Sequence, residues 1–108
     1  MTRLDSPLLS SIILALLDRS MDLAYTPEER KAFLAVAKRL RGALVNLLTA
    51  VFEAGTPELA AANAQLASVS EQLRRNALSM ERVAEDVGAA VALVGTLDSL
   101  LGIAADFL

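Results

Sequence analysis

The chain has 108 residues, of which 55% are hydrophobic and 21% are charged, and its formal net charge is −3. This length fits a single helical domain spanning residues 1–108, and the apolar share is typical of a folded chain. The sequence contains neither cysteine nor histidine, which excludes disulfides, histidine-based catalysis and nearly all zinc, haem and iron–sulfur sites. We therefore expect no metal, no cofactor and no enzymatic activity.

The basic residues are spread along the chain without interleaved aromatic side chains, so nucleic acid is not an expected partner. Arginine outnumbers lysine and alanine is abundant, a composition typical of GC-rich bacterial genomes. The apolar run 8–17 has the length of a signal-peptide core, but Asp5 precedes it and Asp18 and Arg19 follow it, which favours an amphipathic helix. We expect a cytoplasmic protein, with secretion and membrane association left open.

Three helix starts are marked by the prolines, each of which follows a hydroxyl residue. The pairs are Ser6-Pro7, Thr26-Pro27 and Thr56-Pro57. The hydroxyl can cap free backbone N–H groups, and proline at the first helical position loses no hydrogen bond. Glu29 can complete a capping box with Thr26, and Gly55 supplies a stop. The sequence predicts an all-α fold with helices over about 7–24, 27–54 and 57–107.

The third predicted helix carries a long apolar seam. Every seventh position from Leu59 is apolar: Leu59, Leu66, Leu73, Met80, Val87, Val94, Leu101 and Leu108. The companion positions three residues later contain one polar residue, Asn76, which we interpret as a selector of register or oligomeric state. The pattern predicts one continuous helix of about 75 Å at about 1.5 Å per residue. With only Gly55 between them, the second and third helices should form an antiparallel hairpin with coiled-coil-like packing.

The last segment, residues 87–108, is almost uncharged and has a glycine at every seventh position, namely Gly88, Gly95 and Gly102. This glycine column indicates either a track for a closely packed helix or a tolerated weakness on a solvent face. The segment is also long enough to span a membrane or to lie on a lipid surface. Against a span, the seam continues from the charged half 59–86, and no lysine or arginine flanks the run.

The first helix is the expected cover for this tail, yet residues 8–17 and 87–108 together offer more apolar surface than one hairpin can bury. We therefore predict a non-enzymatic assembly or adaptor protein that forms at least a dimer, or docks a partner helix, through this apolar end. The alternative is a membrane- or lipid-surface-active helical protein using the same segments. The expected interface residues are Ile12, Leu16, Gly88, Leu93, Gly95, Leu100, Gly102 and Phe107.

Asp98 is the only charge between Asp86 and Asp106, and we expect it to help set the helix register. In a hairpin turning at Gly55, it faces the serines at positions 10 and 11, whose hydroxyls can donate to it. A position at the water-exposed edge of the bundle, a salt bridge to Arg19 and a fully solvated carboxylate are the alternatives.

Charged residues concentrate in the segment 71–86, where Glu71 and Arg75 have ordinary helical pairing distance. We interpret the cluster as a solvated face, with a partner-docking patch as the alternative. Glu81 and Glu85 stand one turn apart, as in some carboxylate metal sites. Because no histidine is present and Arg82 lies between them, we do not expect a metal there.

Overall fold

The computed structural model describes residues 3–77 and 79–106, which form four α-helices and one short 3-10 helix, with no strand among them. The helices are α1 (Ser6–Ser20), α2 (Pro27–Leu47), α3 (Pro57–Arg75), η1 (Met80–Arg82) and α4 (Val83–Asp106). The predicted all-α class is confirmed. The predicted number of three helices is wrong, because the long third helix is divided into α3 and α4.

Proline marks three of the helix starts as predicted, but the caps differ in detail. The Asp5 carboxylate, not the Ser6 hydroxyl, caps α1 by accepting a hydrogen bond from the Leu8 N–H, at 3.2 Å. Thr26 and Glu29 form the predicted capping box at the start of α2. Thr56 makes no side-chain cap for α3, since its hydroxyl donates to the Glu53 carbonyl instead, at 2.7 Å. Proline thus marks these helix starts correctly, although the capping side chain at α1 differs from the predicted one and α3 has no side-chain cap.

Helix α2 ends at Leu47, seven residues before the predicted end at residue 54. Residues 48–56 instead form a connection in which Phe52 is completely buried. The side chain reaches the core because the backbone leaves the helix, so the apolar spacing that suggested a longer helix belongs to the connection. Gly55 has a φ of +87°, a left-handed conformation that glycine adopts without the steric cost of a Cβ.

The predicted continuous helix over 57–107 breaks between Arg75 and Met80. The last α-helical hydrogen bond here is donated by the Asn76 N–H to the Gln72 carbonyl, and the Ala77 and Ser79 N–H groups form tighter turn bonds. The molecule is therefore 44 Å long, well short of the 75 Å expected for a single helix. Folding back lets the apolar seams of both halves face one core, and α4 passes through Gly88 without a break.

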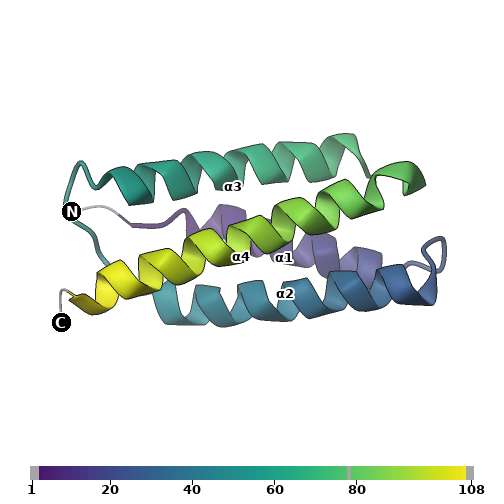
Figure 1. Ribbon diagram of the computed structural model, residues 1–108, viewed down its shortest axis with the longest axis horizontal. Coiled ribbons are helices and arrows are strands. Elements are labelled where there is room, and N and C mark those ends of the chain that lie inside the picture. The colour runs from purple at the N-terminus through teal and green to yellow at the C-terminus, as the bar shows by residue number, and fades with distance from the viewer. Residues whose placement is uncertain (1–2, 78, 107–108) are drawn as a thin grey trace.

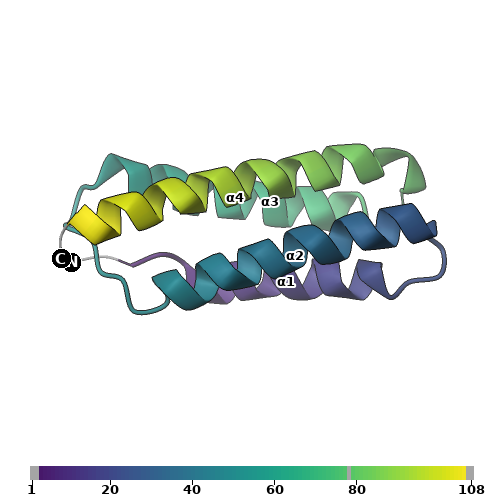
Figure 2. The same cartoon turned by 60° about the horizontal axis from the view of Figure 1, so that its bottom comes forward.

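The four helices form an up-down-up-down bundle, seen from two directions in Figure 1 and Figure 2. Helix α1 lies beside α2 and α3, and α4 also lies beside α2 and α3. No close backbone contact joins α1 to α4 or α2 to α3 in the described part of the chain. The expectation that the first helix covers the tail is therefore wrong. Helices α2 and α3 run antiparallel as predicted, but they lie on a diagonal and do not pack together as a hairpin.

One hydrophobic core runs along the bundle and takes side chains from all four helices. In α4 the buried apolar residues are Val83, Ala90, Leu93, Val94, Leu97 and Leu100. Two expected seam residues, Val87 and Leu101, are only half-buried. Val94 and the companion positions Ala90 and Leu97 are buried as predicted. The buried face of α4 is widened toward Leu93 and Leu100, because the helix packs between two neighbours and not along a single partner.

Candidate functional site

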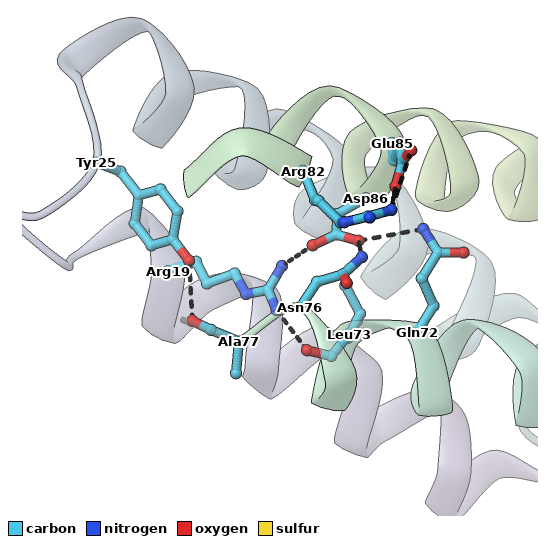
Figure 3. A network of polar contacts seen from close by, with 9 residues as sticks. All are labelled: Arg19, Tyr25, Gln72, Leu73, Asn76, Ala77, Arg82, Glu85 and Asp86. Carbon is cyan, nitrogen blue, oxygen red and sulfur yellow. Dashed lines mark hydrogen bonds and ion pairs between the residues drawn. The ribbon is translucent and has the colours of Figure 1, made fainter. Parts of the chain in front are cut away.

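The most elaborate polar arrangement lies at the end of the bundle where α1 and α3 finish and α4 begins (Figure 3). Arg19, near the end of α1, and Asp86, in the first turn of α4, form an ion pair with an Nη1–Oδ2 distance of 2.5 Å. Their side chains are only 9% and 1% exposed. The pair therefore spans a diagonal of the bundle inside the protein, joining the two helices whose backbones do not meet.

Both partners make further hydrogen bonds. The Asp86 Oδ1 atom accepts hydrogen bonds from the Gln72 and Asn76 side-chain amides, at 3.1 and 2.9 Å. The Arg19 Nη2 group donates to the Leu73 carbonyl at 2.6 Å, which is one of the carbonyls left free near the end of α3. The guanidinium carbon also lies 5.6 Å from the centroid of the Phe33 ring on α2. The cluster thus contacts every helix.

Tyr25 closes the same end of the bundle from the α1–α2 connection. Its ring packs edge-to-face on Phe33, with centroids 5.2 Å apart and an interplanar angle of 74°. Its hydroxyl donates to the Ala77 carbonyl at 3.4 Å, just after the end of α3. The turn between α1 and α2 is thereby attached to the turn between α3 and α4.

We infer a structural role for this cluster from its contacts. The Asp86 carboxylate accepts from three donors, so it has little capacity left to take a proton from a substrate. Among the described residues, no group of three or more acidic, histidine or cysteine side chains could hold a metal ion. A buried ion pair often contributes little net stability, but breaking it is costly because one charge remains buried without a partner. We infer that the cluster holds the helix ends in one register.

Sequence reasoning assigned Asp86 to a solvated face and considered Arg19 only as a partner of Asp98. A signal was present in α1, where Ile12, Leu16 and Arg19 follow the four- and three-residue spacing of one helix face. An arginine that continues an apolar face requires a buried partner. Asn76 lies at the end of α3 and donates a hydrogen bond to Asp86, and its role as a selector of register stays a prediction.

A cleft of about 590 Å³ lies outside this cluster, lined by Gln72, Arg75, Asn76, Arg82 and Glu85. Arg82 already pairs with Glu85 at 3.1 Å, and both side chains are exposed. The amide groups of Gln72 and Asn76 are directed to Asp86. The predicted solvated face is found here and at the exposed Arg74–Glu71 pair.

The expected interface residues separate into two groups. Ile12, Leu16, Leu93 and Leu100 are buried in the core of the single chain, so they are not surface residues of the bundle. Gly88, Gly95 and Gly102 are exposed, and a Cβ atom added at any of them would meet nothing within 4 Å. Among the described residues no helix packs closely against these glycines, which matches the solvent-face alternative. Phe107 lies outside the described residues.

Asp98 is exposed on α4, which matches the solvated alternative. Helix α4 lies diagonally opposite α1, and within residues 3–77 and 79–106 no hydrogen bond joins Asp98 to the serines at 10 and 11. The alternative salt bridge to Arg19 is also wrong, because Arg19 pairs with Asp86. Asp98 therefore stands on the same outer face of α4 as the glycine column.

The outer face of α4 is unusually apolar for a surface. Gly88, Val91, Ala92 and Gly95 are all exposed, and no charge lies between Glu85 and Asp98 on this face. In the described part of the chain, the stretch Val83–Ala104 is the one helix long and apolar enough to cross a membrane by length and composition. Only 28% of its apolar window is buried. Comparison of the chain with family models, curated proteins and solved structures found no match.

Proposed function

We propose that the chain is a non-enzymatic helical assembly protein that self-associates through the outer face of α4, defined here by Gly88, Val91, Ala92, Gly95 and Ser99. The observation that carries the proposal is the mismatch in α4 between its apolar composition and its small buried share of 28%. Exposed apolar area on a single chain is reduced when a second chain covers it. Four residues predicted for the interface are buried in the core, on α1 and α4. In this proposal the exposed residues of α4 take their place.

The shape of this face suits another helix. Small residues at Gly88, Gly95 and Gly102 repeat every two turns, and the space above each is open. Such a column lets two helix backbones approach closely. A second copy offers an identical face, which satisfies the requirement of a two-fold dimer that one patch be complementary to itself.

The position of Asp98 is compatible with an antiparallel pairing about Gly95. In that arrangement Asp98 of each copy is three residues from the two-fold axis, so the two carboxylates stand six residues apart. At about 1.5 Å per residue their separation along the axis is about 9 Å, close to one Debye length at physiological salt. Each carboxylate lies opposite Ala92 of the other copy and remains near the edge of the contact.

Sedimentation equilibrium of the purified chain tests the proposal. Val91 is 45% exposed on the α4 face, so Val91→Glu should leave the fold intact and weaken self-association by about 10-fold or more, because it desolvates a charge. Leu14→Glu is the matched control, since Leu14 is 61% exposed on α1. It should leave the association unchanged.

A chain that sediments as a monomer at all accessible concentrations, in the absence of any partner helix, would contradict self-association. Equal weakening by Leu14→Glu would place the contact elsewhere. Circular dichroism of both variants verifies that helix content is retained. Leu100→Glu is unsuited to this test, because Leu100 is buried and the carboxylate would disrupt the core.

The second candidate function is membrane association of α4, favoured by the length and composition of Val83–Ala104. A span would require α4 to leave the bundle and expose the buried Asp86, which is costly in lipid. If this function holds, the protein should insert into vesicles made of neutral phosphatidylcholine alone. Failure to bind such vesicles, together with a defined soluble dimer, favours the assembly function.

A further inference from the structure

The basic residues are less evenly spread than expected from the sequence, because five of the 10 lie on α2. From residue 30 to residue 52 the sequence has basic residues but no acidic residue. The basic residues are Arg30, Lys31, Lys38, Arg39 and Arg41. The whole chain has 10 basic and 13 acidic residues, and all of the acidic residues lie outside this segment. A chain with a negative net charge therefore carries one strongly cationic surface.

These cations lie on the outer face of α2. Lys31, Lys38, Arg39 and Arg41 are exposed, while the opposite side of the helix is buried in the core. Three apolar side chains share this outer face. Leu34, Val45 and Leu48 are 36%, 68% and 53% exposed.

The cations and apolar residues follow the same helical columns. Leu34, Arg41 and Leu48 are spaced by seven residues, and so are Lys31, Lys38 and Val45. Seven residues are about two turns, so each set forms one row along the helix. From Lys31 to Leu48 the two rows extend for about 26 Å at about 1.5 Å per residue. We call this surface the α2 outer face.

A cleft of about 340 Å³ adjoins one end of the α2 outer face. It is lined by Ser20, Pro27, Glu28, Arg30, Lys31 and Leu34. The Arg30 Nε atom is buried and has no hydrogen-bond partner among the described residues. Because this atom is shielded from the surface, it is not itself a contact for a ligand, and the cleft presents Arg30 and Lys31 together with the Glu28 carboxylate.

We propose that the α2 outer face docks on a membrane surface rich in anionic phospholipid. The exposed cations attract the negative surface, and Leu34, Val45 and Leu48 enter the headgroup layer. Long lysine and arginine side chains can extend to the phosphates while their stems lie against apolar groups. An acidic protein is a poorer match, because three well-exposed aliphatic side chains interrupt the cationic rows.

The proposal is independent of the proposed function, because it uses α2 and leaves the outer face of α4 free. It also differs from insertion of α4, which depends on apolar length and not on lipid charge. The α2 outer face binds at the surface, so the bundle stays folded and the Arg19–Asp86 pair stays buried.

Vesicle flotation tests the proposal on the full chain. The protein should float with vesicles that mix phosphatidylcholine with phosphatidylserine, and not with vesicles of phosphatidylcholine alone. Raising the salt concentration should release it, because screening weakens attraction between charges. Lys38→Gln combined with Arg41→Gln should weaken binding by about 25-fold, since each cation near an anionic surface contributes about 1 kcal/mol, or about fivefold.

Arg74→Gln combined with Arg75→Gln is the matched control, because both arginines are exposed on α3 and the change in net charge is the same. Binding by this control should stay within about twofold of the parent chain, because only charges near the lipid surface contribute. Val45→Ser should weaken binding without changing the dependence on salt. Val91→Glu should bind as the parent does, which separates this proposal from α4 self-association.

Four outcomes would overturn the proposal. The folded protein could fail to float with the phosphatidylserine vesicles, or float equally well with phosphatidylcholine alone. The α3 control could lose as much binding as the α2 variant, which would show that only net charge matters. Binding of polyglutamate by the α2 outer face without binding of vesicles would assign the surface to an acidic protein.

Discussion

The two ends of the bundle are stabilised by different interactions. At the end that contains Tyr25, the buried Arg19–Asp86 pair and its amide donors join all four helices. At the opposite end the interior is apolar, and the buried side chains there include Leu47, Phe52 and Leu59. The polar contacts of that end are exposed and involve Asn63, which accepts from the Asp5 N–H at 2.8 Å.

This difference shows that one end of a small bundle can supply apolar burial while the other end determines which helices are neighbours. Apolar packing is non-directional, so it favours a compact bundle without requiring a particular neighbour for each helix. A buried ion pair with fixed hydrogen bonds is satisfied in one geometry only. We infer that the polar end selects this helix arrangement and that the apolar end supplies much of the burial.

The largest expected effect is at the polar end. Asp86→Asn keeps the shape of the side chain but leaves Arg19 buried without a counter-charge, so we expect a loss of about 3–5 kcal/mol in the free energy of unfolding. Urea denaturation followed by circular dichroism measures it. A loss below about 1 kcal/mol would show that the stability of the bundle does not depend on the charge of this pair.

The double variant Arg19→Met with Asp86→Leu is the control for that experiment. Removing both charges should restore most of the stability, because no buried charge then lacks a partner. If the bundle remains stable but loses its single arrangement, the amide signals of the double variant should broaden in an NMR spectrum. Sharp, well-dispersed signals would instead show that apolar packing alone selects the register.

A smaller effect is expected for a change of similar volume at the apolar end. Leu47 is 1% exposed, and Leu47→Met keeps the buried volume, so the loss should stay below about 1.5 kcal/mol. Denaturation under the same conditions as for Asp86→Asn makes the comparison direct. A loss as large as that of Asp86→Asn would remove the distinction between the two ends.

The smallest expected effect is at Gly95, between the two ends. A Cβ atom there meets nothing within 4 Å, so Gly95→Ala should stabilise the single chain by about 0.5–1 kcal/mol through its better helix propensity. Thermal unfolding at low protein concentration measures this gain. A loss of stability would indicate that a second helix already packs against Gly95.

The helix starts and the all-α class could be predicted because their causes are local. Proline at a first helical position and the Thr26–Glu29 capping box depend on neighbours within one turn. The end of α2 could not be predicted, since the burial of Phe52 depends on helices distant in the sequence. The break after Arg75 was also missed, because an apolar repeat is compatible with one long helix or with two that fold back.

The candidate site was predicted less well than the fold. Asn76 was singled out because it interrupts an apolar row, and it does lie in the buried polar cluster around Asp86. Arg19 and Asp86 were not paired, because the pairing depends on which helices occupy the diagonals of the bundle. Leu93 and Leu100 were expected on a surface, since an apolar helix has the same composition whether its partner is its own chain or another.

The sequence by itself determined that the chain is helical, where three of its helices begin and that its third segment carries an apolar face throughout. These properties follow from backbone sterics, capping and side-chain spacing, which act over one or two turns. Only the tertiary structure decided that the third segment folds back, that α1 lies diagonally opposite α4 and that Arg19 meets Asp86. Those outcomes depend on how four apolar faces share one core, and that competition is settled by packing and by the few buried charges that must find partners.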